Sequence, residues 1–313
     1  MCSFISSLKI HPIRKQRIQT LFIMNIKIKI ILSALLLISC NINPQLLQTV
    51  FTFPETMDEI SAVEVSQKSD WIWTLEDRGN SPALYAFNKK GQILNTLLIT
   101  DVTNQDWEDL TSDPAGNLYI GDFGNNDNQR QDLCIYKIAA KQLKKDKTKI
   151  AAKVSFYFPE QRDFPPKKTE WFYDVESFFI LNDTFYLFTK NRSSAFDGTT
   201  LLYSVPNKTG KHAAQLISTF KTCDTFKQCA ITSADCSDDR SKVALLSSSH
   251  IWLFTDFKTD QFFTGKVQQI DLENYSQKEG LCFVGNNKLY ITDERKKNSG
   301  GNLYQLDLDH LKP

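Results

Sequence analysis

The chain has 313 residues, of which 37 are basic and 36 are acidic. Because the two signs nearly cancel, no overall electric field directs the protein to nucleic acid or to another strongly charged surface. We therefore expect no nucleic-acid partner. The length suits one large β domain with a substantial core, acting as a monomer.

Residues 1–39 are predicted to be a secretory signal peptide. A basic stretch begins at Met24, and residues 30–38 form a short, largely apolar run that ends before Cys40. This order of segments is typical of a secretory signal. The run is shorter than the about 20 apolar residues that a bilayer-spanning helix needs. Residues 1–23 are basic and irregular, so Met24 is an alternative start of the protein.

The end of this segment, Leu37-Ile38-Ser39-Cys40, resembles the lipobox of bacterial lipoproteins. The resemblance implies that Cys40 is lipidated, becomes the new N-terminus and anchors the protein to a membrane, with residues 40–47 as its tether. Because no acidic run follows the cysteine, we expect an outer-membrane lipoprotein of the bacterial cell envelope that faces the periplasm.

Residues 48–313 are predicted to form an all-β domain, a β-propeller, because one pattern of short strands recurs five times. Each copy opens with an acidic residue and a short apolar strand, and a second strand reads like Leu-Tyr-Ile and runs into polar residues. Strand repeats of this kind are typical of propeller blades. The copies begin near Asp58, Trp107, Val175, Ala234 and Lys278.

The apolar runs and turn residues of each copy predict its strands. The first copy gives 60–65, 71–75, 83–87 and 93–99, and the second gives 109–112, 117–121, 133–138 and 153–158. The third gives 177–181, 184–189, 200–205 and 215–220, and the fourth gives 231–236, 242–247, 250–254 and 266–272. The fifth gives only 280–284, 288–292 and 302–306. Residues 49–53 are therefore expected to supply its fourth strand and close a ring of five blades. A sixth blade within residues 139–171 stays open.

One acidic residue per copy is predicted to lie at the mouth of the central channel. In antiparallel blades, the start of the innermost strand and the end of the second strand lie on the same face of the ring. Carboxylates that converge there stay ionised only if cations compensate them. Basic side chains can do so, and Ca²⁺ suits a ring of carboxylate and amide oxygens. The predicted metal ligands are Glu59, Glu108, Glu176, Asp235 and Glu279, and the available basic residues are Arg78, Lys190, Arg192 and Arg295.

A simpler interpretation applies to each acidic residue taken alone. At the start of a strand, Asp and Glu commonly form a turn or accept a hydrogen bond from neighbouring backbone. Their recurrence in every copy favours a functional site at the mouth.

Two further residues are candidates for catalysis there: Asp122 follows a second strand, and His250 follows three serines. A histidine in this place can act as a general base, although it is more often only a turn residue.

The cysteines outside the leader indicate structural roles. Cys223 and Cys229 are six residues apart and could close a small disulfide loop in an oxidising compartment, and the sequence leaves this open. Cys134 and Cys282 lie among apolar residues and are expected to be buried. The sequence contains no Cys-x-x-Cys pair, so a zinc site made of thiolates is not expected.

Four short motifs resemble those of secreted bacterial propellers of the phytase-like esterase and gluconolactonase-like (senescence marker protein) groups. They are Asp106-Trp107-Glu108-Asp109-Leu110, Gly121-Asp122-Phe123-Gly124-Asn125-Asn126, Tyr173-Asp174-Val175-Glu176-Ser177 and Glu279-Gly280-Leu281. The resemblance implies a propeller that holds Ca²⁺ at the channel mouth through the five acidic residues named above, with Asp122 and Asn125 nearby. The strongly basic phosphate-binding rim of the phytases is missing, and the lactonase set of glutamate, asparagine and aspartate cannot be matched residue by residue.

Two function classes therefore stay open. In the first, the protein is a non-catalytic envelope protein that binds a small molecule, a glycan or a protein at the channel mouth. In the second, it is a Ca²⁺-dependent hydrolase of small esters, lactones or phosphoesters, in which the metal polarises the substrate and Asp122 or His250 activates water. The poverty of histidine and of basic rim residues favours the first class, because a propeller scaffold alone selects no activity.

Overall fold

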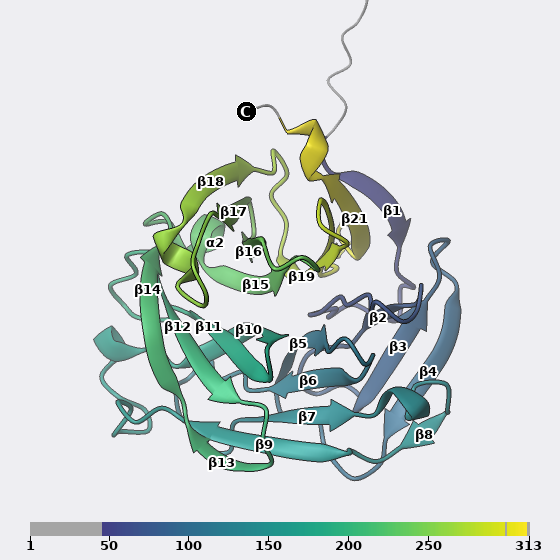
Figure 1. Cartoon of the computed structure of the whole chain (residues 1–313), viewed down its shortest axis with the longest axis horizontal. Helices are drawn as coiled ribbons and strands as arrows, with labels where there is room; N and C mark the ends of the chain where they lie inside the picture. Colours follow the sequence, from purple (N-terminus) through teal and green to yellow (C-terminus); the bar gives the residue numbers. More distant parts are fainter. Residues whose placement is uncertain (1–45, 298, 312–313) are drawn as a thin grey trace, which may run out of the picture. The chain divides into compact units, whose positions relative to one another are not determined.

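The computed structural model describes residues 46–297 and 299–311, which form a ring of five β-sheets around a central axis (Figure 1). The protein is a five-bladed β-propeller, as the sequence predicts. We number the blades in chain order, each with its innermost strand first. The predicted signal peptide, Cys40 and the tether up to residue 45 lie outside the described residues. Within the described part, no helix is long and apolar enough to cross a membrane.

Blades 1 and 2 each carry an additional strand on the outside. Blade 1 contains β2 (Ile72–Thr74), β3 (Ala83–Phe87) and β4 (Ile93–Ile99), with β8 (Lys147–Thr148) parallel to β4. Blade 2 contains β5 (Trp107–Ser112), β6 (Leu118–Asp122), β7 (Cys134–Ile138) and β9 (Ala152–Tyr157), with β13 (Gly210–Ala213) parallel to β9. Because residues 139–171 supply β8 and β9 to these two sheets, they form no sixth blade in the described structure.

Blades 3 to 5 are antiparallel sheets of four strands. Blade 3 contains β10 (Asp174–Leu181), β11 (Thr184–Lys190), β12 (Thr199–Pro206) and β14 (Gln215–Lys221). Blade 4 contains β15 (Ile231–Cys236), β16 (Lys242–Ser247), β17 (His250–Thr255) and β18 (Lys266–Asp271). Blade 5 contains β19 (Lys278–Val284), β20 (Lys288–Asp293), β21 (Asn302–Asp307) and β1 (Gln48–Thr52).

Within residues 46–297 and 299–311, helical segments are few and short. Four 3₁₀ turns are η1 (Ala140–Gln142), η2 (Lys168–Glu170), η3 (Phe262–Thr264) and η4 (Leu308–His310). The α-helix α2 (Phe226–Cys229) is a single turn between blades 3 and 4.

The ring closes between the two ends of the described chain. The N-terminal strand β1 pairs antiparallel with β21, so one sheet contains strands from both ends. This confirms the prediction that residues 49–53 complete the last blade. One predicted strand is weaker than expected: residues 60–65 of blade 1 make only the isolated bridges Ile60–Glu76 and Glu64–Trp73.

The hydrophobic core consists of five clusters, and each fills the space between two adjacent blades. For example, Trp73 and Leu84 of blade 1 pack with Trp107 and Ile120 of blade 2. The alternation of apolar residues along the strands explains this arrangement, because successive side chains point to opposite faces of a sheet. Each face thereby packs against a neighbouring blade, so the closed ring buries both faces of the inner strands, whereas outer strands such as β14 and β18 stay largely exposed.

Hydrogen bonds between inner strands fix the blades near the axis. Side chains near the middle of one inner strand accept hydrogen bonds from backbone N–H groups of the next blade. The donors and acceptors are Phe178 to Asp109 (3.1 Å), Leu281 to Ser233 (3.0 Å) and Phe283 to Asp235 (2.7 Å). Since the acceptors are largely buried, losing one would leave a buried N–H without a partner, so these contacts rigidify the channel.

Candidate functional site

A β-bulge near the start of each inner strand determines which side chains reach the channel mouth. In blades 2 to 5 the pairing of the innermost strand shifts by one residue at this point. A bulge re-aims the extra residue and is often found next to functional sites. The extra residues are Glu108, Glu176, Thr232 and Glu279, and Ser61 takes the corresponding place after the bridged Ile60 of blade 1.

The structure therefore brings three of the five predicted metal ligands, Glu108, Glu176 and Glu279, to one position in their blades. Glu59 comes two residues before Ser61, is exposed and accepts a hydrogen bond from the Asn80 side chain (2.8 Å). Asp235 comes three residues after the bulge and binds the Phe283 N–H instead. The acidic residues of copies 1 and 4 thus lie in a different register from the other three.

A group of three carboxylates lies where blades 1 and 2 meet. One oxygen from each of Asp77, Asp106 and Glu108 lies within 4.8 Å of the other two. Burial, with Asp77 and Asp174 adding to it, raises the pKa of Asp106 to about 7. Burial and the nearby Glu176 carboxylate also raise the pKa of Glu108. Among the described residues, Asp106 Oδ1 is buried without a hydrogen-bond partner, which is unusual for a buried oxygen.

The backbone of the motif Gly121–Asn126 lies directly against these carboxylates. A Cβ atom on Gly124 would lie 2.1 Å from Glu108 Oε1 and 2.7 Å from Asp106 Oδ2, so any larger residue would force these carboxyl groups to move. Asp122, the predicted catalytic carboxylate, is fully buried and pairs with Arg130 at 2.9 Å. It also accepts a hydrogen bond from the Asp106 N–H (3.3 Å). The structure thus places Asp122 beneath the mouth, where it holds the backbone of Asp106.

Blade 3 contributes two cations that are paired with acidic side chains at the mouth. Arg192 binds Asp174 (2.5 Å) and Glu176 (2.6 Å), and Lys190 lies 3.0 Å from Glu176. Although burial opposes ionisation, Lys190 and Arg192 together hold the pKa of Glu176 below its usual value. Burial outweighs the attraction of Arg192 at Asp174 and raises the pKa of that carboxyl to about 7. The charges of both cations are therefore largely compensated within the protein.

A cavity of about 630 Å³ opens beside this network, between blades 3, 4 and 5. Thr232 lies on its wall, and Thr232 Oγ1 is buried without a hydrogen-bond partner in the described structure. Burial raises the pKa of Glu279 to about 7, and burial together with Glu279 raises the pKa of Glu294 to about 8. The lining residues are Lys190, Arg192, Phe226, Lys227, Ala230, Thr232, Ser248, Asn274, Tyr275, Ser276, Gln277, Glu279, Asp293, Glu294, Lys296, Ser299, Gly300 and Tyr304.

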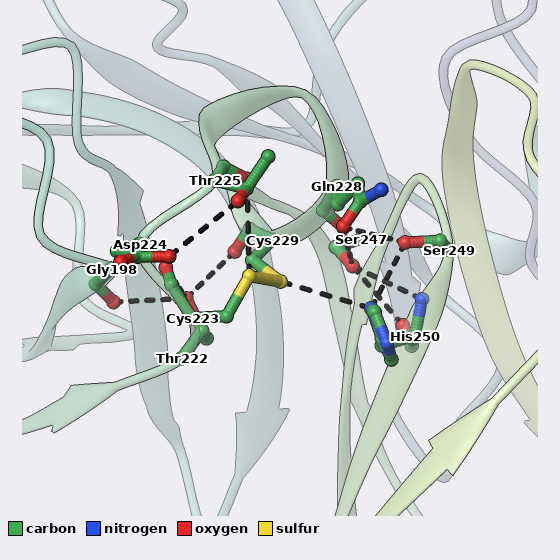
Figure 2. Close-up of a disulfide and its surroundings, with 10 residues drawn as sticks. All are labelled: Gly198, Thr222, Cys223, Asp224, Thr225, Gln228, Cys229, Ser247, Ser249 and His250. Atoms are coloured by element: carbon green, nitrogen blue, oxygen red, sulfur yellow. Dashed lines mark hydrogen bonds between the residues drawn. A yellow bond between two sulfur atoms is a disulfide. The ribbon is translucent and has the colours of Figure 1, made fainter.

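A disulfide holds the loop that carries one side of this cavity. Cys223 and Cys229 are bonded, with their Cα atoms 5.5 Å apart, and α2 lies between them (Figure 2). The Thr222 hydroxyl donates to the Cys229 carbonyl (2.8 Å) and ties the loop to the end of blade 3. The disulfide is thus formed, and it positions Phe226 of α2 at the cavity. Cys134 and Cys282 are buried, as the sequence predicts.

His250 lies next to the disulfide and not among the cavity-lining side chains. Its Nδ1 is 2.9 Å from Ser249 Oγ and 3.7 Å from Cys229 Sγ (Figure 2). The ring also packs on Trp252, with 5.6 Å between the ring centroids. These contacts give His250 a structural place at the start of β17, apart from the Asp77, Asp106 and Glu108 group.

A second cavity, of about 440 Å³, lies at the other ends of the inner strands. Glu64 and Asp235 lie on its wall, and Glu64 accepts a hydrogen bond from the Ser112 hydroxyl (2.5 Å). Burial raises the pKa of Asp235 to about 7 and raises that of Glu64 as well. Both carboxyls already hold neighbouring blades together.

Sequence reasoning did not single out Thr232, Tyr275 or Phe226. A signal for Thr232 exists in the pattern itself. An apolar residue precedes the bulge residue and another follows it two positions later, as in Trp107–Leu110 and in Ile231–Ala234. Aligning the copies on these apolar residues, rather than on their acids, selects Thr232. No comparable signal marks Tyr275 or Phe226, because both lie in connections outside the repeat.

Comparisons with known proteins add only weak likenesses. No family model matches the chain, and no curated protein matches it. A hydrazine synthase chain from Kuenenia stuttgartiensis is similar in structure, with a TM-score of 0.40 and 11% identity over 75% of this chain and 61% of that chain. A chain of a nidogen/laminin complex has a TM-score of 0.45 and 10% identity over 81% of this chain and 77% of that chain. The assignment as a propeller rests on the strand pairing described above.

Proposed function

We propose that this protein is an envelope ligand-binding protein whose binding site is the cavity at the channel mouth. The observation that carries the proposal is the cavity of about 630 Å³ beside a compensated charge network. This volume lies within the range of about 300–1,000 Å³ that is usual for small-molecule sites. A propeller fold is consistent with binding, and the cavity wall offers many hydrogen-bonding groups from three blades.

The rigidity of the mouth supports this function. Lys190 and Arg192 are held by Glu176 and Asp174, and the inner strands are joined by hydrogen bonds between blades. A site that is ordered before the ligand arrives loses less conformational entropy on binding. His250 is bonded to Ser249 and Asp122 is paired with Arg130, and neither residue lines this cavity.

The proposed location of the protein is the periplasmic face of the outer membrane. The lipobox-like Leu37-Ile38-Ser39-Cys40 supports anchoring through Cys40 to the bacterial outer membrane, facing the periplasm. The Cys223–Cys229 disulfide is consistent with an oxidising compartment of this kind. Labelling growing cells that express the full chain with a radioactive fatty acid tests the anchor. Label in the parent that is lost in Cys40→Ala supports it, whereas equal labelling of both chains would contradict it.

Binding is tested with the full chain, purified in a detergent without a sugar headgroup. The change in melting temperature is measured with free amino acids, tripeptides and trisaccharides as separate classes. We expect one class to raise the melting temperature of the parent but not of Tyr275→Ala, which alters the cavity. Tyr157→Ala serves as the control, because Tyr157 is similarly exposed but lies on β9 of blade 2. The same response of Tyr275→Ala and the parent to every class would overturn the proposal.

The group of Asp77, Asp106 and Glu108 favours a second candidate, a Ca²⁺-dependent hydrolase of small esters, lactones or phosphoesters. Three oxygens within 4.8 Å of one another, including the unpartnered Asp106 Oδ1, suit a hard cation. The propeller resemblance described above agrees with a metal at this face. Bound there, Ca²⁺ would polarise a substrate oxygen. The side chains of Asp77, Asp106 and Glu108 would hold the ion, and Asp122 and Arg130 would keep Asp106 in place.

Calorimetric titration of Ca²⁺ into the EDTA-treated protein tests this candidate. We expect heat from the parent, and none from Glu108→Gln, because the variant removes one charge without changing the shape of the side chain. Glu59→Gln is the matched control, because Glu59 is an exposed carboxylate outside the group. If the parent gives no heat, the metal candidate is wrong and these carboxyls serve only the structure.

A further inference from the structure

The lining of the mouth cavity contains no aliphatic side chain larger than alanine among the described residues. Hydroxyl, amide and charged groups dominate the wall, and three aromatic rings accompany them. Cavities that take apolar ligands are lined mainly by hydrophobic side chains. A lipid or another apolar ligand would therefore bury polar groups of the wall without giving them hydrogen-bond partners, which costs free energy. The occupant is therefore expected to carry hydrogen-bonding groups together with an apolar face for the aromatic rings.

Two aromatic rings at the cavity are exposed to solvent. Tyr275 is 63% exposed, the highest value among the exposed large hydrophobic side chains of the described residues, and Phe226 is 38% exposed. Both are held in place: the disulfide closes the loop around Phe226, and Lys278 fixes the connection around Tyr275 by donating to Asn274 and Ser276. An exposed ring on a tethered segment offers a flat apolar face, and the C–H face of a pyranose ring is the matching shape on a polar ligand.

A buried hydroxyl group at the cavity, that of Thr232, can both donate and accept a hydrogen bond. Thr232 Oγ1 is buried without a hydrogen-bond partner in the described structure, and a buried hydroxyl in this state calls for an explanation. Glu279 and Glu294 line the same cavity, and their carboxyl oxygens can accept hydrogen bonds. Alcohol groups, which both donate and accept, can bond to the threonine hydroxyl and to both carboxyl groups.

The charges at the cavity argue against an ionic ligand. Lys190 and Arg192 are already paired with Glu176 and Asp174. An anionic carboxylate or phosphate that reached Lys190 or Arg192 would have to displace those partners and leave two buried acids uncompensated, so only the exposed Lys227 and Lys296 of the wall could attract it. Peptides, in turn, depend on apolar pockets for their side chains or on a free strand edge, and the lining described above offers no apolar pocket.

We propose that the ligand of the mouth cavity is a neutral oligosaccharide, with one sugar ring stacked on Tyr275 and its hydroxyl groups bonded to Thr232 and to the Glu279 and Glu294 carboxyls. This inference rests on the proposed function, in which the same cavity binds a ligand. It adds the chemical class of that ligand and names the residues that select it.

The test is isothermal titration of the full chain, in a detergent without a sugar headgroup, with cellotriose, maltotriose, chitotriose, xylotriose and mannotriose. We expect at least one of them to bind. Tyr275→Ala should weaken binding by about tenfold, as loss of a central aromatic contact usually does. Tyr275→Phe should keep most of the affinity, because the ring remains. Thr232→Val should weaken binding at an unchanged melting temperature, because it replaces only the hydroxyl. Tyr157→Ala should bind like the parent.

The outcomes separate this inference from the function on which it rests. If none of the trisaccharides binds but tripeptides or amino acids bind in a manner that Tyr275→Ala abolishes, the cavity is a ligand site and the oligosaccharide inference is overturned. Saccharide binding that Tyr275→Ala and Thr232→Val both leave intact would overturn it as well, because the sugar would then sit elsewhere. If no class binds, both proposals are overturned.

Discussion

Replacing Arg192 by methionine removes the cation on which two buried acids depend. The guanidinium lies 2.5 Å from Asp174 and 2.6 Å from Glu176, and the carboxyl side chains are 0% and 3% exposed. Removing one partner of a buried ion pair costs about 3–5 kcal/mol, because the remaining charge is left uncompensated. Since the Arg192 side chain is 24% exposed, water screens part of the interaction. We therefore expect a loss near the lower end, about 3 kcal/mol, or a melting temperature lower by roughly 6–10 °C.

The pH dependence of this loss gives a sharper test than its size. Lys190 and Arg192 hold the pKa of Glu176 below the ordinary value of 4.5, so the stability from this pairing is present above pH 4.5 and is lost as the pH falls through the folded-state pKa. Without Arg192 the acids keep their protons to higher pH. The difference between parent and variant should therefore be full at pH 8 and should shrink at the most acidic pH where both chains still fold.

Differential scanning calorimetry of both chains across this pH range measures the effect. Arg78→Met is the control, because Arg78 is 59% exposed and 3.9 Å from Asp106, and a surface pair contributes less than about 1 kcal/mol. A deficit below about 1 kcal/mol at pH 8, or one that does not change with pH, would refute the reasoning. In that case Arg192 contributes no more than its exposed counterpart, and the acids are stabilised by other means.

Three further results are expected. Gly124→Ala should destabilise the fold by about 1–3 kcal/mol, measured by urea unfolding, because the new methyl group meets Glu108; unchanged stability would contradict the close approach. Lys278→Met should speed amide hydrogen exchange around Tyr275, because the buried ammonium donates to the oxygens of this loop; unchanged exchange would count against it. Asp235→Asn should flatten the stability profile between pH 4 and 7, because burial raises the folded-state pKa of Asp235 to about 7 and its ionisation opposes folding as the pH rises; an unaltered profile would show that Asp235 does not titrate in this range.

Periodic features of the sequence predicted the fold well. The five-fold recurrence of short strands and the missing fourth strand of the last copy together predicted the blade number and the closing strand, because both depend on repeated apolar patterns. The core between the blades follows from the same alternation. The strand bounds differ by a few residues, as for β5, which begins at Trp107 rather than at 109.

The candidate site was less predictable, since it depends on register and not on composition. A bulge adds one residue to a strand and turns the next side chain to another face. No single residue type marks the position of a bulge in the sequence. Glu59 and Asp235 therefore looked equivalent to Glu108 in the sequence but lie elsewhere in their blades. Tyr275 lies in a connection outside the repeat, so its place at the cavity follows only from how blade 5 folds.

The seam between β1 and β21 has a consequence for how the chain is made. Thr52 and Asn302 are hydrogen-bonded at 2.7 Å although 250 residues separate them. During synthesis, β1 emerges before all the other strands of the propeller and β21 emerges after them, so the ring is completed only when β21 has left the ribosome. Contacts between such distant residues form slowly, because the chain must lose loop entropy before they stabilise it. Any pull exerted through the segment before residue 46 also acts first on β1, so this seam is both the last part to assemble and the first to bear a mechanical load.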